Sequence, residues 1–441
     1  MQGTVWGSLY CTATMDKLAQ LMYKEDELLY KYKGVVDTPC LGMVDDLLIV
    51  QKCSNNSVKA NAVTNAFVEM KKLKFNKDKC FRIHISKQSK KSKTSLPCPE
   101  LKVHEESMKN SNREKYLGDK IDGSGTPKAT IDDRKSRGYA AASEILAILK
   151  DIPLGEHKME IGLHLRQAML INAILFNSEA WHNVVDDDLK VLEAIDEHLL
   201  RSIVQGHAKT PLEFLYLETG AVPIRHIISG RRIMYLQTIL KRSDNELTKR
   251  ILVAQKNQPS HGDFVNLVDS DLKKVNLNLD YDEIETLSPT LLKNMVKKKV
   301  REAAYKHLRE RQSTHSKVRN IEYKELKCQP YITSSLFSNE EVNLLHKLRS
   351  CSVNCKVNFK GRHGDDLACP LCVAGGLDNQ PHILKCSKIV EKLSSTELAN
   401  HKVKYEDIFG EPSKQKVVTA LFQKMLKIRE SLLENQNETE I

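Results

Sequence analysis

The pattern of apolar and polar positions changes along the chain. It predicts a mixed N-terminal part with strands and helices, followed by a helical remainder. The run 40–50 is apolar except for two adjacent carboxylates, Asp45 and Asp46. Apolar residues on both sides of an acidic break predict a two-stranded hairpin with the aspartates at its turn. Between residues 128 and 255 the spacing becomes helical, with apolar residues on one face that we expect to be core. These include Leu189, Leu192, Ile195, Leu199 and Ile203.

Breaks in these patterns predict where the parts of the chain begin and end. The glycines and the proline of segment 123–127 interrupt both helix and strand. Residues 256–288 are polar and acidic with few regular signals, and they predict a linker. Ser288 and Pro289 then provide an N-cap and a first-turn proline for a further helix. The parts expected from these breaks are 1–122, 128–255, 256–345 (a linker and a basic helical connector), 346–392, and 393–441 (a short helix and a polar tail).

The helix predicted after Ser288 carries many basic residues beside an apolar face. Three consecutive lysines, Lys297, Lys298 and Lys299, stand in its middle. Basic amphipathic helices bind nucleic acids or membrane surfaces, and the net charge of +11 favours a polyanionic partner. We expect these lysines to contact RNA or DNA phosphates. A helix that only keeps its polar side in water is the alternative.

Four residues of metal-binding type stand close together near the C-terminal end. Cys369 and Cys372 are separated by two residues, His382 follows after nine more, and Cys386 after a further three. Three thiolates and one imidazole at this spacing can surround a tetrahedral Zn²⁺ ion. His382 and Cys386 are one helical turn apart, so both can face the ion. Because protein atoms fill all four positions, this zinc would be structural.

A second set of zinc ligands is also possible. Cys351 and Cys355 could join Cys369 and Cys372 in a four-cysteine site. The Cys3His set is more compact, and we prefer it.

An aromatic residue, Phe359, lies just ahead of this Cys/His segment among basic residues. Aromatic rings in basic surroundings stack on the bases of single-stranded nucleic acids. We therefore expect Phe359 to stack on a base while its basic neighbours meet phosphates. Those neighbours are Arg349, Lys356, Arg362 and His363.

Composition restricts the class of protein. A chain of 441 residues with 41% hydrophobic residues can form several domains with real cores. No apolar run approaches the roughly 18 residues that a membrane span requires, and the first residues do not resemble a signal peptide. Eleven cysteines, an odd number, are typical of reduced intracellular thiols. We expect a protein of the nucleus and cytoplasm that is not secreted and has no membrane partner.

Four short segments, in this order, resemble the palm of a reverse transcriptase of the non-LTR (LINE-type) retrotransposons. Segment 3–8 (Gly-x-x-x-Gly-Ser) is similar to motif B, and segment 43–46 (Met-Val-Asp-Asp) to the aspartate hairpin of motif C. Segment 73–79 (Leu-x-x-Asn-x-x-Lys) is similar to motif D, and segment 115–118 (Lys-Tyr-Leu-Gly) to motif E. Segments 170–181 and 210–220 are similar to parts of the thumb region of these elements.

The resemblance implies an α+β fold. A truncated reverse-transcriptase palm, an antiparallel sheet with helices, would occupy 1–122, and an all-helical thumb and connector would follow over 128–345. The Cys/His segment at 346–392 is similar to the zinc knuckle near the C-terminus of many LINE-type proteins. The implied activity is two-metal nucleotidyl transfer with Mg²⁺. Its partners would be an RNA template, a DNA primer or target, and deoxynucleoside triphosphates.

The resemblance also implies roles for individual residues. Asp45 would ligate Mg²⁺, and Asp46 would support the metal pair. Lys79 would approach the triphosphate and stabilise the leaving pyrophosphate. Gly7 and Ser8 would shape the pocket for the template and the nucleotide.

Two departures from the family pattern change what is expected. Met43 stands where the family usually has an aromatic residue, so its thioether and not a ring would pack against the substrate. The family also takes a metal-binding aspartate from motif A, in the fingers and palm upstream of motif B, where an endonuclease region often precedes it. We expect the isolated chain to be inactive as a polymerase. The alternative is a non-catalytic nucleic-acid-binding remnant, or a domesticated protein, with a structural zinc knuckle.

Overall fold

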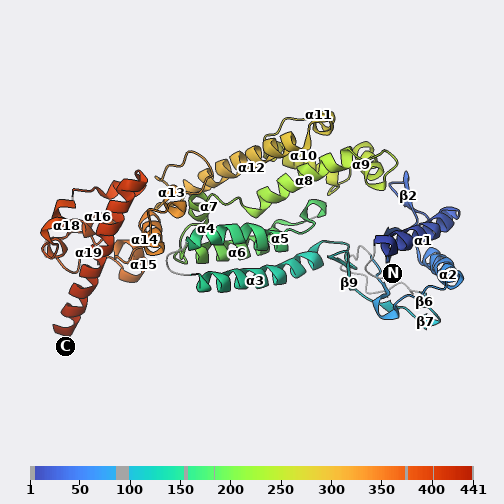
Figure 1. Cartoon of the computed structure of the whole chain (residues 1–441), viewed down its shortest axis with the longest axis horizontal. Helices are drawn as coiled ribbons and strands as arrows, with labels where there is room; N and C mark the ends of the chain where they lie inside the picture. Colours follow the sequence, from blue (N-terminus) through green and yellow to red (C-terminus); the bar gives the residue numbers. More distant parts are fainter. Residues whose placement is uncertain are drawn as a thin grey trace. The chain divides into compact units, whose positions relative to one another are not determined.

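The computed structural model describes residues 5–85, 99–152, 157–182, 184–372, 376–400 and 402–439. The side chains of residues 5–7, 399–400 and 437–439 lie outside this description. The described fold is α+β and mostly helical, with short strands confined to its first part (Figure 1). In these ranges no helix is both long and apolar enough to cross a membrane.

Contacts group the chain into two compact units, each made of three segments. Unit 1 contains Met1–Arg134, Asn177–Asp188 and Ser229–Val296. Unit 2 contains Lys135–Phe176, Leu189–Ile228 and Lys297–Ile441. The predicted ranges 128–255 and 256–345 therefore each contribute residues to both units.

Unit 1 begins with two helices and a series of short strands. The helices are α1 (Val5–Tyr23) and α2 (Ser54–Met70). The strands are β1 (Tyr30–Tyr32), β2 (Val36–Thr38), β3 (Leu41–Met43), β4 (Asp46–Leu48), β5 (Phe81–Arg82), β6 (Lys102–Val103), β7 (Glu106–Ser107), β8 (Lys109–Asn110), β9 (Arg113–Tyr116) and β10 (Asp119–Asp122). β10 ends and α3 (Lys128–Asp151) begins on either side of the break predicted at 123–127.

The strands of unit 1 do not assemble into one sheet among the described residues. They form five separate pairs, of which β1–β2, β3–β4, β6–β7 and β9–β10 are antiparallel and β5–β8 is parallel. Each strand is only two to four residues long, so each pair has a short hydrogen-bonded ladder. The continuous antiparallel sheet of a palm is thus not seen here.

A small apolar core joins the first elements of unit 1. Leu18 and Met22 of α1, one helical turn apart, are fully buried against Phe67 and Val68 of α2. Leu47 and other half-buried residues of the neighbouring segments pack on the same cluster. This core fixes the hairpin β3–β4 against both helices.

Residues 256–288 form helices where the sequence predicts a linker. α9 (Leu247–Asn257) is followed by α10 (Phe264–Lys274) and α11 (Tyr281–Thr286). Val265, Val268 and Leu272 of α10 are buried at helical spacing. The side chains of Asp280 and Glu283 form a reciprocal cap at the start of α11. A narrow apolar face among many acidic residues therefore suffices to order this segment.

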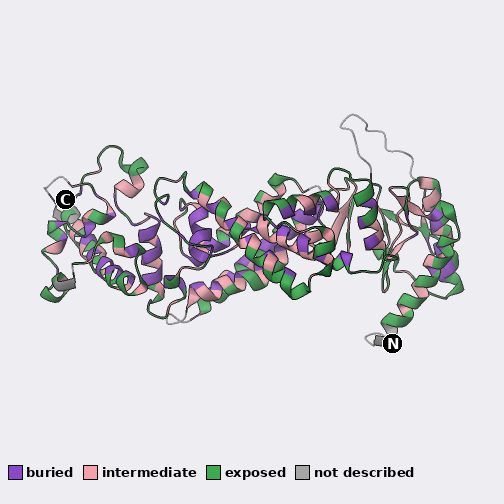
Figure 2. Ribbon diagram, turned by 90° about the horizontal axis from the view of Figure 1, so that it is seen from above, coloured by how far each residue is buried: buried purple, intermediate pink, exposed green. Residues whose placement is uncertain are grey.

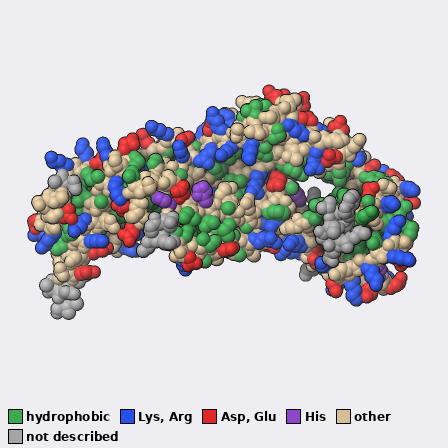
Figure 3. All heavy atoms as spheres, in the orientation of Figure 1, with side chains coloured by type: hydrophobic (Ala, Val, Ile, Leu, Met, Phe, Trp, Pro, Cys, Tyr) green, Lys and Arg blue, Asp and Glu red, His purple; other side chains and the backbone are tan. Residues whose placement is uncertain are grey.

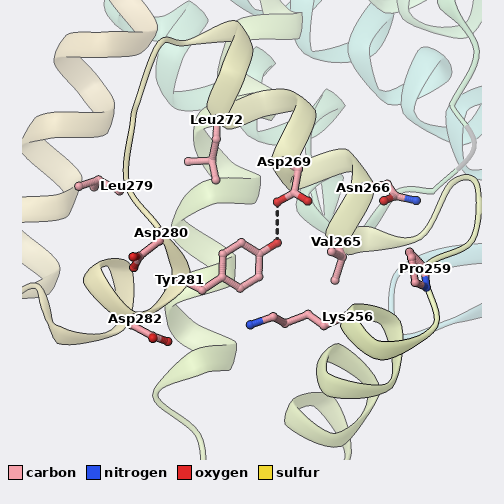
Figure 4. A pocket seen from close by; sticks show the side chains of 10 residues that line it. All are labelled: Lys256, Pro259, Val265, Asn266, Asp269, Leu272, Leu279, Asp280, Tyr281 and Asp282. Atoms are coloured by element: carbon pink, nitrogen blue, oxygen red, sulfur yellow. Dashed lines mark hydrogen bonds between the residues drawn. The ribbon is translucent and has the colours of Figure 1, made fainter.

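A hollow of about 560 Å³ lies among α9, α10 and α11 (Figure 4). Three of the residues that line it, Tyr281, Asp269 and Lys256, interact with one another. The Tyr281 hydroxyl donates to Asp269 Oδ1 at 2.9 Å, and Lys256 Nζ lies 4.7 Å from the centre of the Tyr281 ring. Burial, followed by the hydrogen bond to Asp269, raises the pKa of Tyr281 above its usual value. Tyr281 is thus a neutral donor that closes one side of the hollow.

Unit 2 is built from helices (Figure 1). Its first helices include most of α3, α4 (Lys158–Leu165), α5 (Ile171–Ile174), most of α6 (Asp186–Ile203), α7 (Leu212–Thr219) and the start of α8 (Ile224–Leu240). The end of α12 (Pro289–Gln312) follows, then α13 (Pro330–Thr333), α14 (Asn339–Arg349), α15 (Lys360–His363), α16 (Gln380–Ile383), α17 (Ser387–Val390), α18 (Ser395–Asn400) and α19 (Pro412–Thr439). Buried residues gather along the helices (Figure 2). The apolar face predicted for α6 is confirmed, since Leu192, Ile195, Leu199 and Ile203 are buried.

The C-terminal region differs from its prediction of a short helix and a polar tail. α19 runs without interruption from Pro412 to Thr439. Val418, Phe422 and Met425 are fully buried along one face of it. α19 packs on α14 and on α17, and it continues through the segment predicted to be a polar tail.

The centre of unit 2 is α7, which carries a buried carboxylate. Glu218 is 0% exposed and accepts hydrogen bonds from Arg349 Nε at 3.0 Å and Nη2 at 2.8 Å. The hydroxyls of Tyr323 and Tyr331 donate to it at 2.5 and 2.6 Å. Gly220 ends the helix at φ 63°, where an added Cβ would lie 2.2 Å from the Cys328 nitrogen. This polar centre ties α7 to the segments that lead to the Cys/His region.

Candidate functional sites

The aspartate hairpin forms as predicted. β3 and β4 pair antiparallel with Met43 opposite Asp46, which leaves Val44 and Asp45 as a two-residue turn. Asp45 therefore lies in the turn, and Asp46 is the first residue of β4. Both carboxylates are exposed, and Met43 beside them is 58% exposed. The pair can meet a ligand from solvent.

The backbone of this turn is strained. Val44 has φ 59°, a left-handed conformation that β-branched residues very rarely adopt. Its carbonyl oxygen accepts a hydrogen bond from Cys11 Sγ of α1 at 3.4 Å. Strained residues persist where their surroundings hold them, and they concentrate at functional sites. The contact from α1 is one such restraint.

Two of the other three palm-like segments are linked to this hairpin by a direct contact or a shared core. The Tyr116 hydroxyl, in the motif-E-like segment, donates to the carbonyl of Leu41 at 3.4 Å. Leu117 and Gly118 make the tight turn between β9 and β10 with φ 47° and 93°. Phe75, in the motif-D-like segment, packs on the core that holds Leu47. Burial raises the pKa of Tyr116, and the nearby Asp46 carboxylate raises it further.

Gly7, Ser8 and Lys79, also expected at this site, are not linked to the aspartate hairpin by a hydrogen bond or ion pair in the described ranges. α1 begins at Val5, so Gly7 and Ser8 lie inside its first turns; Ser8 is exposed, and the surroundings of Gly7 lie outside the described side chains. Lys79 ends a single turn of 3₁₀-helix, Lys77–Lys79, and is exposed. Within the described part of the chain, no hydrogen bond or ion pair joins the Lys79 side chain to the aspartates.

Asp45 and Asp46 alone do not complete a two-metal site. Among the described residues, no third carboxylate, imidazole or thiol joins them in a cluster of ligand atoms. Their oxygens suit Mg²⁺, but two-metal catalysis needs ligands that bridge and orient both ions.

The Cys/His cluster is more complete. The sulfur atoms of Cys369, Cys372 and Cys386 and a ring nitrogen of His382 all lie within 4.8 Å of one another. Cys369 Sγ is 3.9 Å from Cys386 Sγ, and Cys372 Sγ is 3.3 Å from His382 Nε2. Cys369 and Cys386 are buried, and His382 is half-buried. This group of three sulfurs and one imidazole could hold a zinc ion.

Local structure brings these four ligands together. Ala368 and Leu377 form an antiparallel bridge, and the Cys369 N–H donates to the carbonyl of Gly376 at 2.8 Å. A Cβ on Gly376 would lie 2.6 Å from Cε1 of His382, so glycine leaves room for the imidazole. The first two cysteines therefore sit on a tight knuckle beside the ring.

The expected single helical turn between His382 and Cys386 is not formed. His382 lies in α16, where the Asn379 side chain accepts its N–H at 2.8 Å. Cys386 is instead the N-cap residue of α17. A turn closed by the Lys385 N–H and the His382 carbonyl at 2.8 Å joins the two helices and still directs both ligands to one point.

Electrostatics favour a cation at this point. Burial raises the pKa of Cys386 to about 11, and the neighbouring Cys369 and Cys372 contribute to the shift. Three sulfurs so close together are unfavourable as thiolates on their own. A zinc ion reverses this balance, because a coordinated thiol is deprotonated by the metal.

Cys351 and Cys355, the alternative zinc ligands, do not lie in this cluster. Cys351 Sγ approaches the carbonyl of Lys317 at 3.7 Å, and burial raises the pKa of Cys355 to about 11. Among the described residues neither belongs to the four-ligand cluster. The Cys3His set is thus the one whose atoms meet.

The three lysines expected to bind nucleic acid lie on α12, and their surroundings differ. Ser288 caps this helix, as predicted, by accepting the Leu291 N–H at 3.2 Å. Lys297 and Lys298 are exposed, and Lys299 is half-buried. Two of the three share one acidic neighbour, Glu302, which lies 4.0 Å from Lys298 and 3.1 Å from Lys299. Figure 3 shows basic side chains interspersed with acidic ones over the face that it draws.

Phe359 is half-buried and surrounded by cationic and imidazole groups. The Arg362 guanidinium lies 5.0 Å from its ring centre, and Lys317 Nζ lies 5.8 Å from it. The His207 ring meets it edge-on at 5.2 Å. His207 and Lys317 stand far from Phe359 in the sequence and carry no motif, so only the fold reveals them.

Comparison with known proteins adds no relative. No family model matches the chain, and no curated protein sequence matches it.

Proposed function

We propose that the chain is part of an RNA-directed DNA polymerase of the non-LTR retrotransposon class. The observation that carries this proposal is the exposed aspartate pair on a tight hairpin, with Val44 strained and bonded to α1. A solvated surface turn gains nothing from such strain, whereas a metal site needs its carboxylates in fixed positions. The motif-like segments around the hairpin support the same assignment.

The proposed roles follow from the resemblance to the palm motifs. Asp45 and Asp46 would bind Mg²⁺ through their carboxylate oxygens, and Met43 and Ser8 would border the nucleotide and template. Bound Mg²⁺ would stabilise charge on the triphosphate and activate the primer hydroxyl. Because no third ligand joins the pair among the described residues, the chain alone should not extend a primer. We place it inside the cell, in the nucleus and cytoplasm.

Binding of Mn²⁺ tests this proposal, because Mn²⁺ replaces Mg²⁺ and is visible by electron paramagnetic resonance. With an RNA template, a DNA primer and a deoxynucleoside triphosphate, we expect bound Mn²⁺ that is lost in Asp45→Asn/Asp46→Asn. Asp78→Asn, also an exposed acid of unit 1, is the matched control. Equal Mn²⁺ binding by the wild type and the double variant would refute the proposal.

A second candidate is a non-catalytic nucleic-acid-binding protein with a structural zinc knuckle. The observation that favours it is the complete Cys3His ligand group, in contrast to the incomplete aspartate site. Under this alternative, RNA binding persists unchanged in Asp45→Asn/Asp46→Asn and no Mn²⁺ is bound at the hairpin.

A further inference from the structure

The surroundings of Phe359 are made by three separate segments of unit 2. Phe359 ends the 3₁₀ turn Val357–Phe359, directly before α15. His207 comes from the connection between α6 and α7, and Lys317 from the segment after α12. Lys317 Nζ donates to the carbonyl of Asn358 at 2.6 Å, which fixes this lysine beside the ring. The arrangement is therefore a built feature of the fold and not one side chain in a loop.

Several cationic side chains near Phe359 have no acidic partner in the described ranges. Arg362, Lys317, Lys209 and Lys360 are exposed, and in the ranges that the structure describes none of them forms an ion pair. The acidic residues nearest to Arg362 in the sequence are Asp365 and Asp366, and Asp366 already pairs with Lys356 at 2.7 Å. The pKa of His207 is lowered first by burial and then by the nearby cations Arg362, Lys317 and Lys209.

We propose that Phe359, His207, Lys317, Lys209 and Arg362 form a binding site for an unpaired nucleobase and its flanking phosphates. This inference rests on the proposed nucleic-acid function, and it assigns to unit 2 a site that does not depend on the aspartate hairpin. A purine or pyrimidine stacks on the ring or on the planar Arg362 guanidinium. Lys209 and Lys317 meet the phosphates on either side.

The geometry selects single strands. An aromatic side chain stacks on a base only when that base is free of its own helix. Duplex nucleic acid offers phosphates alone, so its binding gains from the lysines but not from Phe359. RNA and DNA single strands share the required chemistry and form separate arms of the test.

The experiment measures binding of short oligonucleotides that contain 2-aminopurine, whose fluorescence changes when the base stacks. Phe359→Leu removes the ring and keeps an apolar side chain. Phe409→Leu is the matched control, because Phe409 is 43% exposed in the same unit and also has a guanidinium, that of Arg349, at 5.0 Å. Arg362→Gln changes an exposed residue and carries little risk to folding. Zinc content and circular dichroism report whether each variant is folded.

We expect the wild type to change the fluorescence of single-stranded RNA or DNA. Phe359→Leu should lose this change and bind about tenfold more weakly, which corresponds to about 1.4 kcal/mol. Arg362→Gln should weaken binding, and Phe409→Leu should resemble the wild type. Duplex binding should be equal for both phenylalanine variants.

Two results contradict the inference and are distinguishable. If the wild type binds single strands and both phenylalanine variants bind equally well, the Phe359 site is refuted while nucleic-acid binding stands. If the wild type binds no nucleic acid even at low salt, the proposed function itself fails. Should Phe359→Leu be unfolded, an unchanged affinity of folded Arg362→Gln refutes the site.

Discussion

Glu218 and Arg349 show how single residues hold unit 2 together. Both side chains are almost fully buried, and two hydrogen bonds join them at 3.0 and 2.8 Å. Burial raises the pKa of Glu218, but Arg349 and the two tyrosine hydroxyls outweigh it, so the net shift is downward and the residue stays ionised. Removing one partner would leave the other as an uncompensated charge in the core.

Arg349→Met should therefore destabilise unit 2 by about 3–5 kcal/mol. Urea unfolding followed by circular dichroism measures this change. Arg362→Gln, an exposed arginine without an ion pair in the described ranges, should stay within about 0.5 kcal/mol of the wild type. A loss below about 1 kcal/mol for Arg349→Met would show that the buried pair contributes little.

The neighbouring His346 predicts a pH dependence. It is fully buried, and burial lowers its pKa to about 4. Between pH 6.5 and 4 the unfolded state binds a proton that the folded state does not, so stability is present above pH 6.5 and is lost as pH falls toward 4. The loss should reach about 3 kcal/mol. In His346→Leu the urea midpoint of unit 2 should change much less over this range, and an identical pH profile would contradict the assignment.

The zinc ligands could be predicted from their spacing in the sequence, whereas contacts between residues far apart in the sequence could not. Cys369, Cys372, His382 and Cys386 were found because their spacing alone satisfies a zinc ion. The partners of Phe359 were not, since His207 and Lys317 reach it only through tertiary packing. The buried role of Arg349 was likewise missed: an arginine near basic neighbours favoured a phosphate contact, but Glu218 of α7 takes it.

At the scale of elements, α12 divides its basic residues between two tasks. Its arginines bond inside unit 2: Arg301 to the carbonyl of Gly220 at 3.1 Å, Arg309 to that of Ile321 at 2.5 Å, and Arg311 to Glu213 at 2.6 Å. Within the described ranges, Lys298 and Lys299 form ion pairs with Glu302 alone, and Lys297 forms no ion pair. The lysines, and not the arginines, remain available to phosphates.

Replacing Lys297, Lys298 and Lys299 by glutamine should lower RNA affinity for all sequences and flatten its salt dependence, because fewer counterions are released. A salt titration of binding measures both effects. The control replaces the exposed lysines Lys414, Lys424 and Lys427 of α19 by glutamine. It removes the same amount of positive charge from another helix. If the two triple variants behave alike, α12 is only a solvated surface.

The Cys/His segment should depend on zinc for its folding, because α16 and α17 are only four residues long and cannot be stable alone. Cys372→Ser and His382→Ala should each abolish stoichiometric zinc binding, whereas Cys351→Ser should retain it. Chelation should raise hydrogen exchange in α16 and α17 and leave α6 unchanged. Retained zinc in the first two variants together with loss in Cys351→Ser would favour the four-cysteine site.

Elements with a strong local signal were predicted, and weakly amphipathic ones were not. The hairpin β3–β4, the break at 123–127 and the capped start of α12 follow from turn, breaker and cap residues. α10 and α11 were missed because an acidic composition hid a narrow apolar face. The full length of α19 was missed because its fully buried residues, Val418, Phe422 and Met425, lie in its first half, and its polar end carries no such apolar signal.

At the scale of the whole chain, the fold class was predictable while the grouping of segments was not. Helices follow strands in the expected order, and this order is visible in the sequence. Each unit, however, takes three separate segments of the chain. Composition breaks mark where elements end, but not which distant elements pack together.

In the proposed polymerase, the aspartate hairpin holds a metal ion next to Cys11 and Tyr116, whose side chains both contact the hairpin. Iron-mapped cleavage can locate this metal, since Fe²⁺ bound in place of Mg²⁺ generates radicals that cut the backbone nearby. With primer, template and nucleotide present, we expect cuts at residues 41–48, near Cys11 and near residues 116–119. All of them should disappear in Asp45→Asn/Asp46→Asn. If no cuts appear in these three segments, or if the double variant is cut at the same places, the hairpin does not hold the metal.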